Sequence, residues 1–342
     1  MTYFSQRAGH FAVASKQPVA AFPRNCLVEL SNACNHACVF CHNPFMHRAA
    51  GILNKDLFKR FIEDAVSLGL DEVGLYSTGE PFMVKHLSWY IRAAKDAGVK
   101  RIYLTTNGAL ATLPKVIEAV ECGLDSLKFS INAASRKSYE LTHGRDEFDL
   151  VLANVEAIHR WKTETNASLQ LLGSFIHTKL TKDEIEPHRA VFSRYFEDIV
   201  YLQAQSQGGR TGERIKEIIE APFYPDLASL QPCEMLWNRI HITWEGFLSA
   251  CCVDYEHDLV FADYRSGQPL AELWNNELIQ DLRRKHLDKT LDGLICKSCM
   301  LGGNAPYEPI SDIRGAFSNK SKTEDDTSSR IHIALRAISP SK

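Results

Sequence analysis

Three cysteines in one short stretch carry the strongest chemical signal in this sequence. Cys34, Cys38 and Cys41 have the spacing C-x3-C-x2-C and directly follow an apolar run. Three thiolates can hold three irons of a four-iron cluster, whereas clusters kept for structure or electron transfer normally have four cysteine ligands. The fourth iron would then stay open to a substrate or cofactor. A zinc site completed by His36 or His42 is the alternative that this loop leaves open.

A second motif follows the next apolar run. Gly79-Glu80-Pro81 comes after Val73 to Ser77, and it would present backbone carbonyls and a carboxylate at the C-terminal end of a strand. Together with the cysteine loop, in which the aromatic Phe40 precedes the last cysteine, it resembles the radical S-adenosylmethionine (SAM) superfamily. The resemblance implies that the Gly-Glu motif receives the methionine ammonium of SAM, and it favours an iron–sulfur cluster over zinc.

Four more cysteines form a group in the last third of the chain. Cys233 and Cys251 flank a predicted hairpin at Glu245-Gly246, and Cys296 and Cys299 form a C-x2-C pair. Four thiols suit a closed site, which by itself fits zinc as well as a cluster. After a radical SAM core, the arrangement resembles Twitch, the truncated form of the SPASM accessory domain. The resemblance implies two [4Fe-4S] clusters, one that binds SAM and one auxiliary cluster.

The elements that position these motifs alternate between short apolar runs and amphipathic helical patterns, which predicts an α/β fold with a parallel sheet. The predicted strands are Cys26 to Leu30, Glu72 to Ser77, Arg101 to Thr105, Ser126 to Ile131, Leu169 to Phe175 and Ile199 to Gln203. The predicted helices carry the apolar stripes of Leu57 to Val66, Leu87 to Ala94, Val116 to Val120 and Leu150 to Ile158, with weaker ones at Lys182 to Phe196 and Glu213 to Ile219.

Six β/α units are too few for the eight of a closed barrel. The resemblance implies a partial (β/α)6 TIM-like barrel with a small C-terminal iron–sulfur domain. We expect a lead-in at 1–23, the radical SAM core at 24–220, the SPASM/Twitch domain at 221–313 and a tail at 314–342. Loops at the C-terminal ends of parallel strands carry the chemistry of such folds, and both motifs of the core fall on these loops.

Further polar residues are expected at the same edge. Asn107 follows the third strand, Ser130 and Asn132 end the fourth, and Arg145 lies beyond it. Taken alone, Asn107 fits a turn and Ser130 a buried hydroxyl. In the superfamily, polar side chains that end the fourth strand commonly touch the ribose or carboxylate of SAM, which implies this role for Ser130 and Asn132. Arg145 can pair with the carboxylate of SAM, or it can be a solvated arginine at the start of a helix.

Composition restricts the partners and the compartment. The 342 residues carry a net charge of -3, so nothing global indicates nucleic acid or a membrane surface as a partner. We expect no signal peptide, and no membrane span, since no apolar stretch reaches ~20 residues. Seven of the ten cysteines have ligand-like spacings, which indicates a reducing compartment, and we expect a cytoplasmic protein. Cys26 and Cys122 lie in core-like patterns and are interpreted as packing residues.

The reaction follows from the resemblance. It implies reductive cleavage of SAM, with an electron from a donor such as flavodoxin or ferredoxin, and removal of hydrogen from a small-molecule substrate by the 5′-deoxyadenosyl radical. A fully ligated auxiliary cluster is better suited to carry an electron than to bind a substrate. This favours oxidation of an alcohol to a ketone on a sugar or aminocyclitol-like molecule, as in Twitch-type dehydrogenases.

Other reactions remain open. Cys252, beside a cluster ligand, can act as the hydrogen donor of an epimerase, or it can be an ordinary small buried residue. Modification of a peptide is less favoured because only about 25 residues precede the first strand, few for a leader-binding domain. Modification of a protein is less favoured because sulfatase maturases resemble the seven-cysteine SPASM form. A non-catalytic metal-binding or electron-transfer protein is the alternative outside the enzymes. His177, His241 and Glu245 are candidate proton acceptors by residue type.

Overall fold

The computed structural model describes residues 3, 4, 6, 15–211, 217–218, 230–301 and 305–312. The expected division between core and accessory domain, most of the helix predicted at 213–219 and the tail from 314 onward lie outside these residues. No helix of the described residues is long and apolar enough to cross a membrane.

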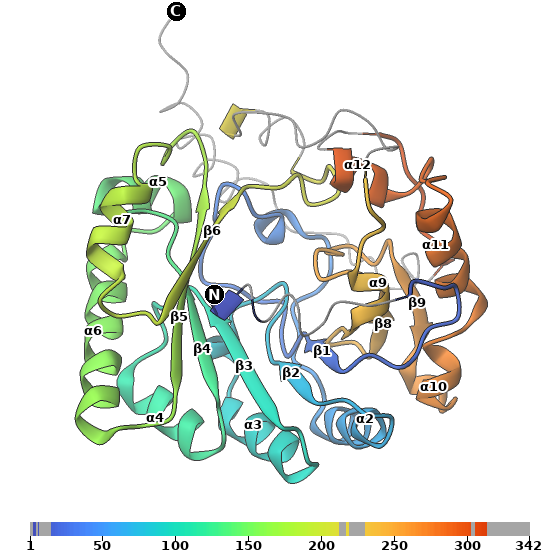
Figure 1. Ribbon diagram of the computed structural model, residues 1–342, viewed down its shortest axis with the longest axis horizontal. Helices are drawn as coiled ribbons and strands as arrows, with labels where there is room; N and C mark the ends of the chain where they lie inside the picture. Colours follow the sequence, from blue (N-terminus) through green and yellow to red (C-terminus); the bar gives the residue numbers. More distant parts are fainter. Residues whose placement is uncertain are drawn as a thin grey trace, which may run out of the picture.

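A nine-stranded sheet organises the chain, with the strand order β6-β5-β4-β3-β2-β1-β7-β8-β9. The first six strands are parallel, and each is next to its neighbour in the sequence. They are β1 (Asn25–Val28), β2 (Glu72–Gly74), β3 (Arg101–Thr106), β4 (Ser126–Ser130), β5 (Gln170–His177) and β6 (Asp198–Gln203). All six predicted strands are present. The sheet curves without closing, so the predicted partial barrel is confirmed (Figure 1).

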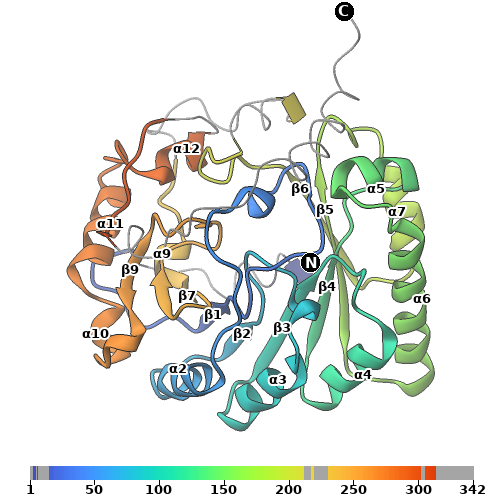
Figure 2. The same ribbon diagram turned by 180° about the vertical axis from the view of Figure 1, so that it is seen from behind.

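Helices cover the outer side of this sheet (Figures 1 and 2). They are α2 (Lys55–Ser67), α3 (Leu87–Asp96), α4 (Leu113–Glu121), α5 (Arg136–His143), α6 (Phe148–Thr165) and α7 (Ile185–Phe192). The periodicity predicted α2, α3, α4 and α6, while α7 is shorter than the predicted helix and α5 was not predicted. Short 3-10 helices occur at η1 (Asn43–Phe45), η2 (Pro81–Met83) and η3 (Tyr264–Ser266).

Helix α2 shows how the sequence sets these elements. Asn54 caps its start by accepting hydrogen bonds from the backbone N–H groups of Asp56 and Leu57. Phe58 and Phe61 are fully buried in the main core, and each contributes about 1.5–3 kcal/mol by leaving water. The helix ends before Gly69, whose φ of +99° favours glycine.

The accessory segment extends the same sheet. Strand β7 (Arg239–Ile242) pairs in parallel with β1, and β8 (Phe247–Ser249) and β9 (Val260–Asp263) follow in antiparallel order. The predicted hairpin is confirmed between β7 and β8, where Gly246 has a φ of +96°. The helices of this segment are α9 (Met235–Asn238), α10 (Leu270–Leu273), α11 (Glu277–Leu287) and α12 (Ile295–Leu301).

Residues 15–23 of the lead-in contain no helix or strand and lie along the accessory segment. The indole N–H of Trp237 donates to the Gln17 carbonyl at 2.7 Å, and that of Trp274 donates to the Ala21 carbonyl at 2.9 Å. These bonds hold the lead-in in an extended path.

Candidate functional site

The two predicted SAM-binding motifs pack directly against each other. A Cβ atom at Gly79 would lie 2.4 Å from the carbonyl oxygen of Ser31 and 2.6 Å from that of Ala33. Only glycine therefore allows this approach. The backbone N–H of Glu80 donates to the Ala33 carbonyl at 2.8 Å. The start of the cysteine loop is thus fixed by the turn that follows β2.

Glu80 ties this turn to the end of β3. Its carboxylate is 3% exposed and accepts hydrogen bonds from the Phe82 N–H at 3.1 Å, the Thr106 hydroxyl at 2.8 Å and the Asn107 N–H at 2.8 Å. Burial raises the pKa of Glu80 to about 7, against the effect of these donors. Because the carboxylate is occupied, we expect the backbone carbonyls of the turn to receive the SAM ammonium. Pro81 begins η2 directly after it.

Two other predicted residues contact the cysteine loop. The side-chain amide of Asn107 donates to the Asn35 side-chain oxygen at 2.8 Å and lies 4.0 Å from the Cys34 sulfur. Arg145 Nε donates to the Asn35 carbonyl at 3.0 Å. Both residues therefore hold the first half of the loop in place. Phe40 is buried at 7% exposure in a small apolar cluster with Val39.

Ser130 and Asn132 lie together at the end of β4. The Asn132 side-chain oxygen accepts from the Ile176 N–H at 2.7 Å, and its amide reaches the Ser130 hydroxyl at 3.5 Å. Asn132 thus joins β4 to β5. Contacts of both residues with SAM remain predictions.

His143 is a neighbour of the cysteine loop that the sequence did not reveal. Its Nε2 accepts the backbone N–H of Asn132 at 3.1 Å, and its Nδ1 lies 3.6 Å from the Cys38 sulfur. Burial lowers the pKa of His143 well below its usual value, so the ring is neutral. Because Nε2 is an acceptor, the proton sits on Nδ1 and points at the sulfur.

The spacing of the thiols distinguishes a cluster from zinc. Around one tetrahedral zinc, Zn–S bonds of about 2.3 Å bring the sulfurs to about 3.8 Å of each other. Among the described residues, the only His, Cys, Asp or Glu group with ligand atoms within 4.8 Å of one another is His36, Cys38 and His143. It contains one loop thiol, and His36 is bonded to Glu147 at 2.7 Å. Neither cysteine set therefore has three sulfurs as close together as one zinc requires.

The accessory cysteines come from separate elements and line one cavity. Cys233 precedes α9, Cys251 follows β8, and Cys296 and Cys299 lie one turn apart on α12. All four are free thiols. Four protein sulfurs would therefore surround a group bound in this cavity.

A short loop connects the accessory site to the cysteine loop. The hydroxyl of Tyr255, four residues after Cys251, lies 3.5 Å from the Cys41 sulfur. The Ser77 hydroxyl, just before the Gly-Glu motif, donates to the Cys252 carbonyl at 3.4 Å. The two sites are thus held together by direct contacts.

The three candidate proton acceptors differ in their surroundings. Glu245 is bonded to Arg48 at 2.6 and 3.0 Å. Although burial opposes ionisation, hydrogen bonds from His257 and Arg48 lower the pKa of Glu245 to about 2, so it is a poor proton acceptor. His177 ends β5. His241 lies on β7, is 3% exposed, and has no hydrogen-bond partner of normal geometry among the described residues.

Cys252 lies beside His241. A hydrogen bond with the Cys251 thiol lowers the pKa of Cys252 against the effect of burial, and His241 lowers it further. Its sulfur is 3.7 Å from the Met235 sulfur. Cys26 is fully buried in the main core and Cys122 packs against that core, as predicted.

Comparison with known proteins agrees with this geometry. The family description "Radical SAM superfamily" matches residues 28–189, and the SPASM "iron-sulfur cluster-binding domain" matches residues 233–300. A relative from Pyrococcus abyssi, named probable GTP 3',8-cyclase, is 32% identical over 296 residues, which cover 73% of this chain and 91% of the relative. A relative of the same name from Sulfurisphaera tokodaii is 29% identical over 130 residues, and the match spans 38% of this chain and 41% of the relative.

Solved structures show the same fold. BtrN in complex with AdoMet and 2-DOIA superposes with a TM-score of 0.55 at 16% identity, over 85% of this chain and 99% of BtrN. Streptococcus suis SuiB bound to S-adenosylmethionine superposes with a TM-score of 0.61 at 14% identity, over 85% of this chain and 78% of SuiB. The chain therefore belongs to the radical SAM superfamily, with a SPASM accessory domain, and its cofactors are SAM and two [4Fe-4S] clusters.

Proposed function

We propose that this enzyme oxidises an alcohol carbon to a ketone on a small sugar-like or cyclitol-like molecule. The observation that carries the proposal is the accessory cavity lined by Cys233, Cys251, Cys296 and Cys299. Four thiols give every iron of an auxiliary cluster a protein ligand, as in clusters that transfer electrons. When bound, SAM and the clusters would supply a hydrogen-atom acceptor and an electron acceptor.

The chain's own residues orient the substrate and take the remaining proton. Removing a hydrogen atom and an electron from an alcohol leaves the hydroxyl proton to be accepted by a base. His241 is our candidate for this role, because its buried ring nitrogens are without hydrogen-bond partners of normal geometry among the described residues and histidine is the most frequent general base in enzymes. Glu245 is excluded by its bonds to Arg48.

Product analysis tests the reaction. Oxygen-free reconstituted enzyme with SAM and dithionite is incubated with a panel of sugars and aminocyclitols. The expected products are 5′-deoxyadenosine and a ketone in equal amounts. Turnover without any ketone contradicts the proposal, and absence of 5′-deoxyadenosine with every substrate indicates a non-catalytic protein. Flavodoxin or ferredoxin replaces dithionite in a second series to test the expected electron donor.

Epimerisation is a second candidate, favoured by the half-buried position of Cys252 beside His241. A thiol donor exchanges its hydrogen with solvent, so the reaction in deuterium oxide would place deuterium on the product carbon. Cys252→Ala is expected to leave ketone formation intact, and it would abolish product formation if the thiol were the donor.

A third candidate comes from the curated relatives. The Pyrococcus abyssi protein aligned over 91% of its length is named probable GTP 3',8-cyclase, so GTP belongs in the substrate panel. A cyclised nucleotide as the only product would replace the proposed oxidation.

A further inference from the structure

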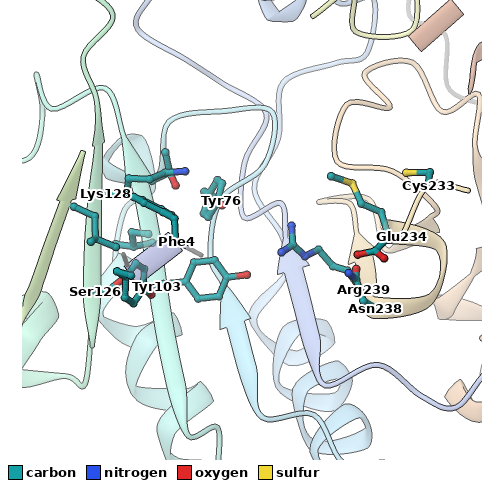
Figure 3. A pocket seen from close by; sticks show the side chains of 14 residues that line it. Phe4, Tyr76, Tyr103, Ser126, Lys128, Cys233, Glu234, Asn238 and Arg239 are labelled. Atoms are coloured by element: carbon teal, nitrogen blue, oxygen red, sulfur yellow. The ribbon is translucent and has the colours of Figure 1, made fainter. Parts of the chain in front are cut away.

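The interior of the partial barrel contains a cavity of about 480 Å³. Strands β3, β4 and β5 supply one wall, and β7 with α9 and the two residues before it supplies the other. Figure 3 shows Lys128 on one side and Arg239 on the other, with Tyr76 and Tyr103 between them. The volume suits one sugar-sized molecule.

The strand register directs both cations into this cavity. In β4, Ser126 and Lys128 line the cavity, whereas Leu127 and Phe129 are fully buried on the other face. In β7, Arg239 lines the cavity and Ile240 is fully buried. Side chains alternate between the faces of a strand, so Lys128 and Arg239 cannot turn outward without moving the sheet.

Neither cation is neutralised by a described residue. Lys128 and Arg239 form no ion pair within the described part of the chain, and Arg239 Nε is buried without a hydrogen-bond partner there. The hydroxyl of Thr105, also on the cavity wall, is likewise without a partner. Glu234, the one carboxylate among the described residues of the wall, is paired with Lys16 at 3.1 Å. Both cations are half-buried, and the buried donor atoms of Arg239 and Thr105 favour a bound partner.

We propose that Lys128 and Arg239 bind an anionic group, a phosphate or carboxylate, on the substrate. The inference rests on the proposed function in one respect, namely that the substrate occupies the barrel. Lys128 lies two residues before Ser130, or about 7 Å along the strand from the edge where SAM is expected. A sugar ring spans this distance, so the anion anchors one end while the reacting carbon faces the SAM edge.

Anion binding can be measured without turnover. Holoenzyme with SAM is dialysed to equilibrium against radiolabelled inorganic phosphate at low ionic strength, and acetate is then added as a competitor. We expect saturable binding of one phosphate per chain. Lys128→Gln and Arg239→Gln should each weaken it about tenfold, the loss of one charged hydrogen bond. Lys137→Gln, which removes an exposed lysine of α5, should bind as the unaltered enzyme does.

The outcomes separate this inference from the proposed reaction. Absence of saturable binding, or equal affinity in Lys128→Gln and the unaltered enzyme, overturns the anion site. If Arg239→Gln loses the auxiliary iron while Lys128→Gln binds phosphate normally, the arginine supports the cluster and not the anion. That result also overturns the anion site. Strong competition by acetate supports a carboxylate, and weak competition supports a phosphate. An enzyme that binds phosphate as expected but oxidises no alcohol contradicts only the reaction.

Discussion

Replacing His143 with phenylalanine should lower the reduction potential of the SAM-binding cluster. The Nδ1–H of His143 points at the Cys38 sulfur across 3.6 Å, and its tautomer is set by the Asn132 N–H bonded to Nε2. Hydrogen bonds to cluster sulfurs favour the more negative, reduced state. Phenylalanine preserves a flat ring that can stack on Tyr139, whose ring centroid lies 4.0 Å from that of His143, and it removes only the polar atoms.

The size of the effect follows from one lost hydrogen bond. A net contribution of about 1 kcal/mol to the reduced state corresponds to about 40 mV for a one-electron couple. The Asn132 N–H also loses its acceptor while remaining buried, which should destabilise the fold by about 1–3 kcal/mol. The side chain of His143→Gln can accept a hydrogen bond from this N–H and donate one to the sulfur. This variant should therefore recover much of the reduction potential and of the stability.

A potentiometric titration followed by electron paramagnetic resonance measures the shift. The SAM-binding cluster is identified as the signal that changes when SAM is added, and the auxiliary cluster serves as the internal reference. The reasoning is refuted if His143→Phe leaves the SAM-binding cluster at its original potential, or if both clusters shift by the same amount.

Three further changes test the surroundings of the site. Arg48→Met should destabilise the protein by about 3–5 kcal/mol in urea unfolding, because buried Glu29 and Glu245 would lose their common partner; an equally stable variant contradicts this. Since burial raises the pKa of Glu80 from 4.5 to about 7, the folded apoprotein holds this proton more tightly than the unfolded chain. Relative to Glu80→Gln, the free energy of unfolding should therefore fall by about 3 kcal/mol as the pH rises from 4.5 to 7. If the stability of the two proteins depended on pH in the same way, the pKa of Glu80 would not be raised. Cys299→Ser should lower the iron content from about eight to about four per chain and abolish ketone formation, while 5′-deoxyadenosine is still released; unchanged iron content would exclude Cys299 as a ligand.

Local patterns account for what the sequence predicted correctly. The stripe around Phe58 and Phe61 has helical spacing and ends at Gly69, so α2 could be placed without knowledge of its neighbours. The cysteine loop and the Gly-Glu motif each follow a strand, and parallel strands bring such loops to one edge. Their direct contact at Gly79 is a consequence of the fold class.

Long-range contacts could not be predicted in this way. His143 is 105 residues from Cys38, and it reaches the sulfur because α5 packs back over the cysteine loop. Nothing in its own neighbourhood distinguishes it from other histidines. Lys128 did carry a usable signal, because Ser126, Lys128 and Ser130 alternate with apolar residues along β4. Such alternation indicates a strand with one polar face, which here is the interior of the barrel.

The position of β7 explains why the accessory site and the substrate cavity are neighbours. β7 pairs with β1 so that Arg239 lies opposite Asn25 and His241 opposite Leu27. Arg239 lines the cavity, and His241, two residues on, lies on the same face. The chain then turns at Gly246, and β8 leads to Cys251. A shift of β7 by one residue would turn both polar side chains to the opposite face of the sheet, against the apolar core. One four-residue strand thus carries both the arginine proposed to bind the anion and the histidine proposed to accept the proton, and the turn at Gly246 joins it to the strand that precedes Cys251.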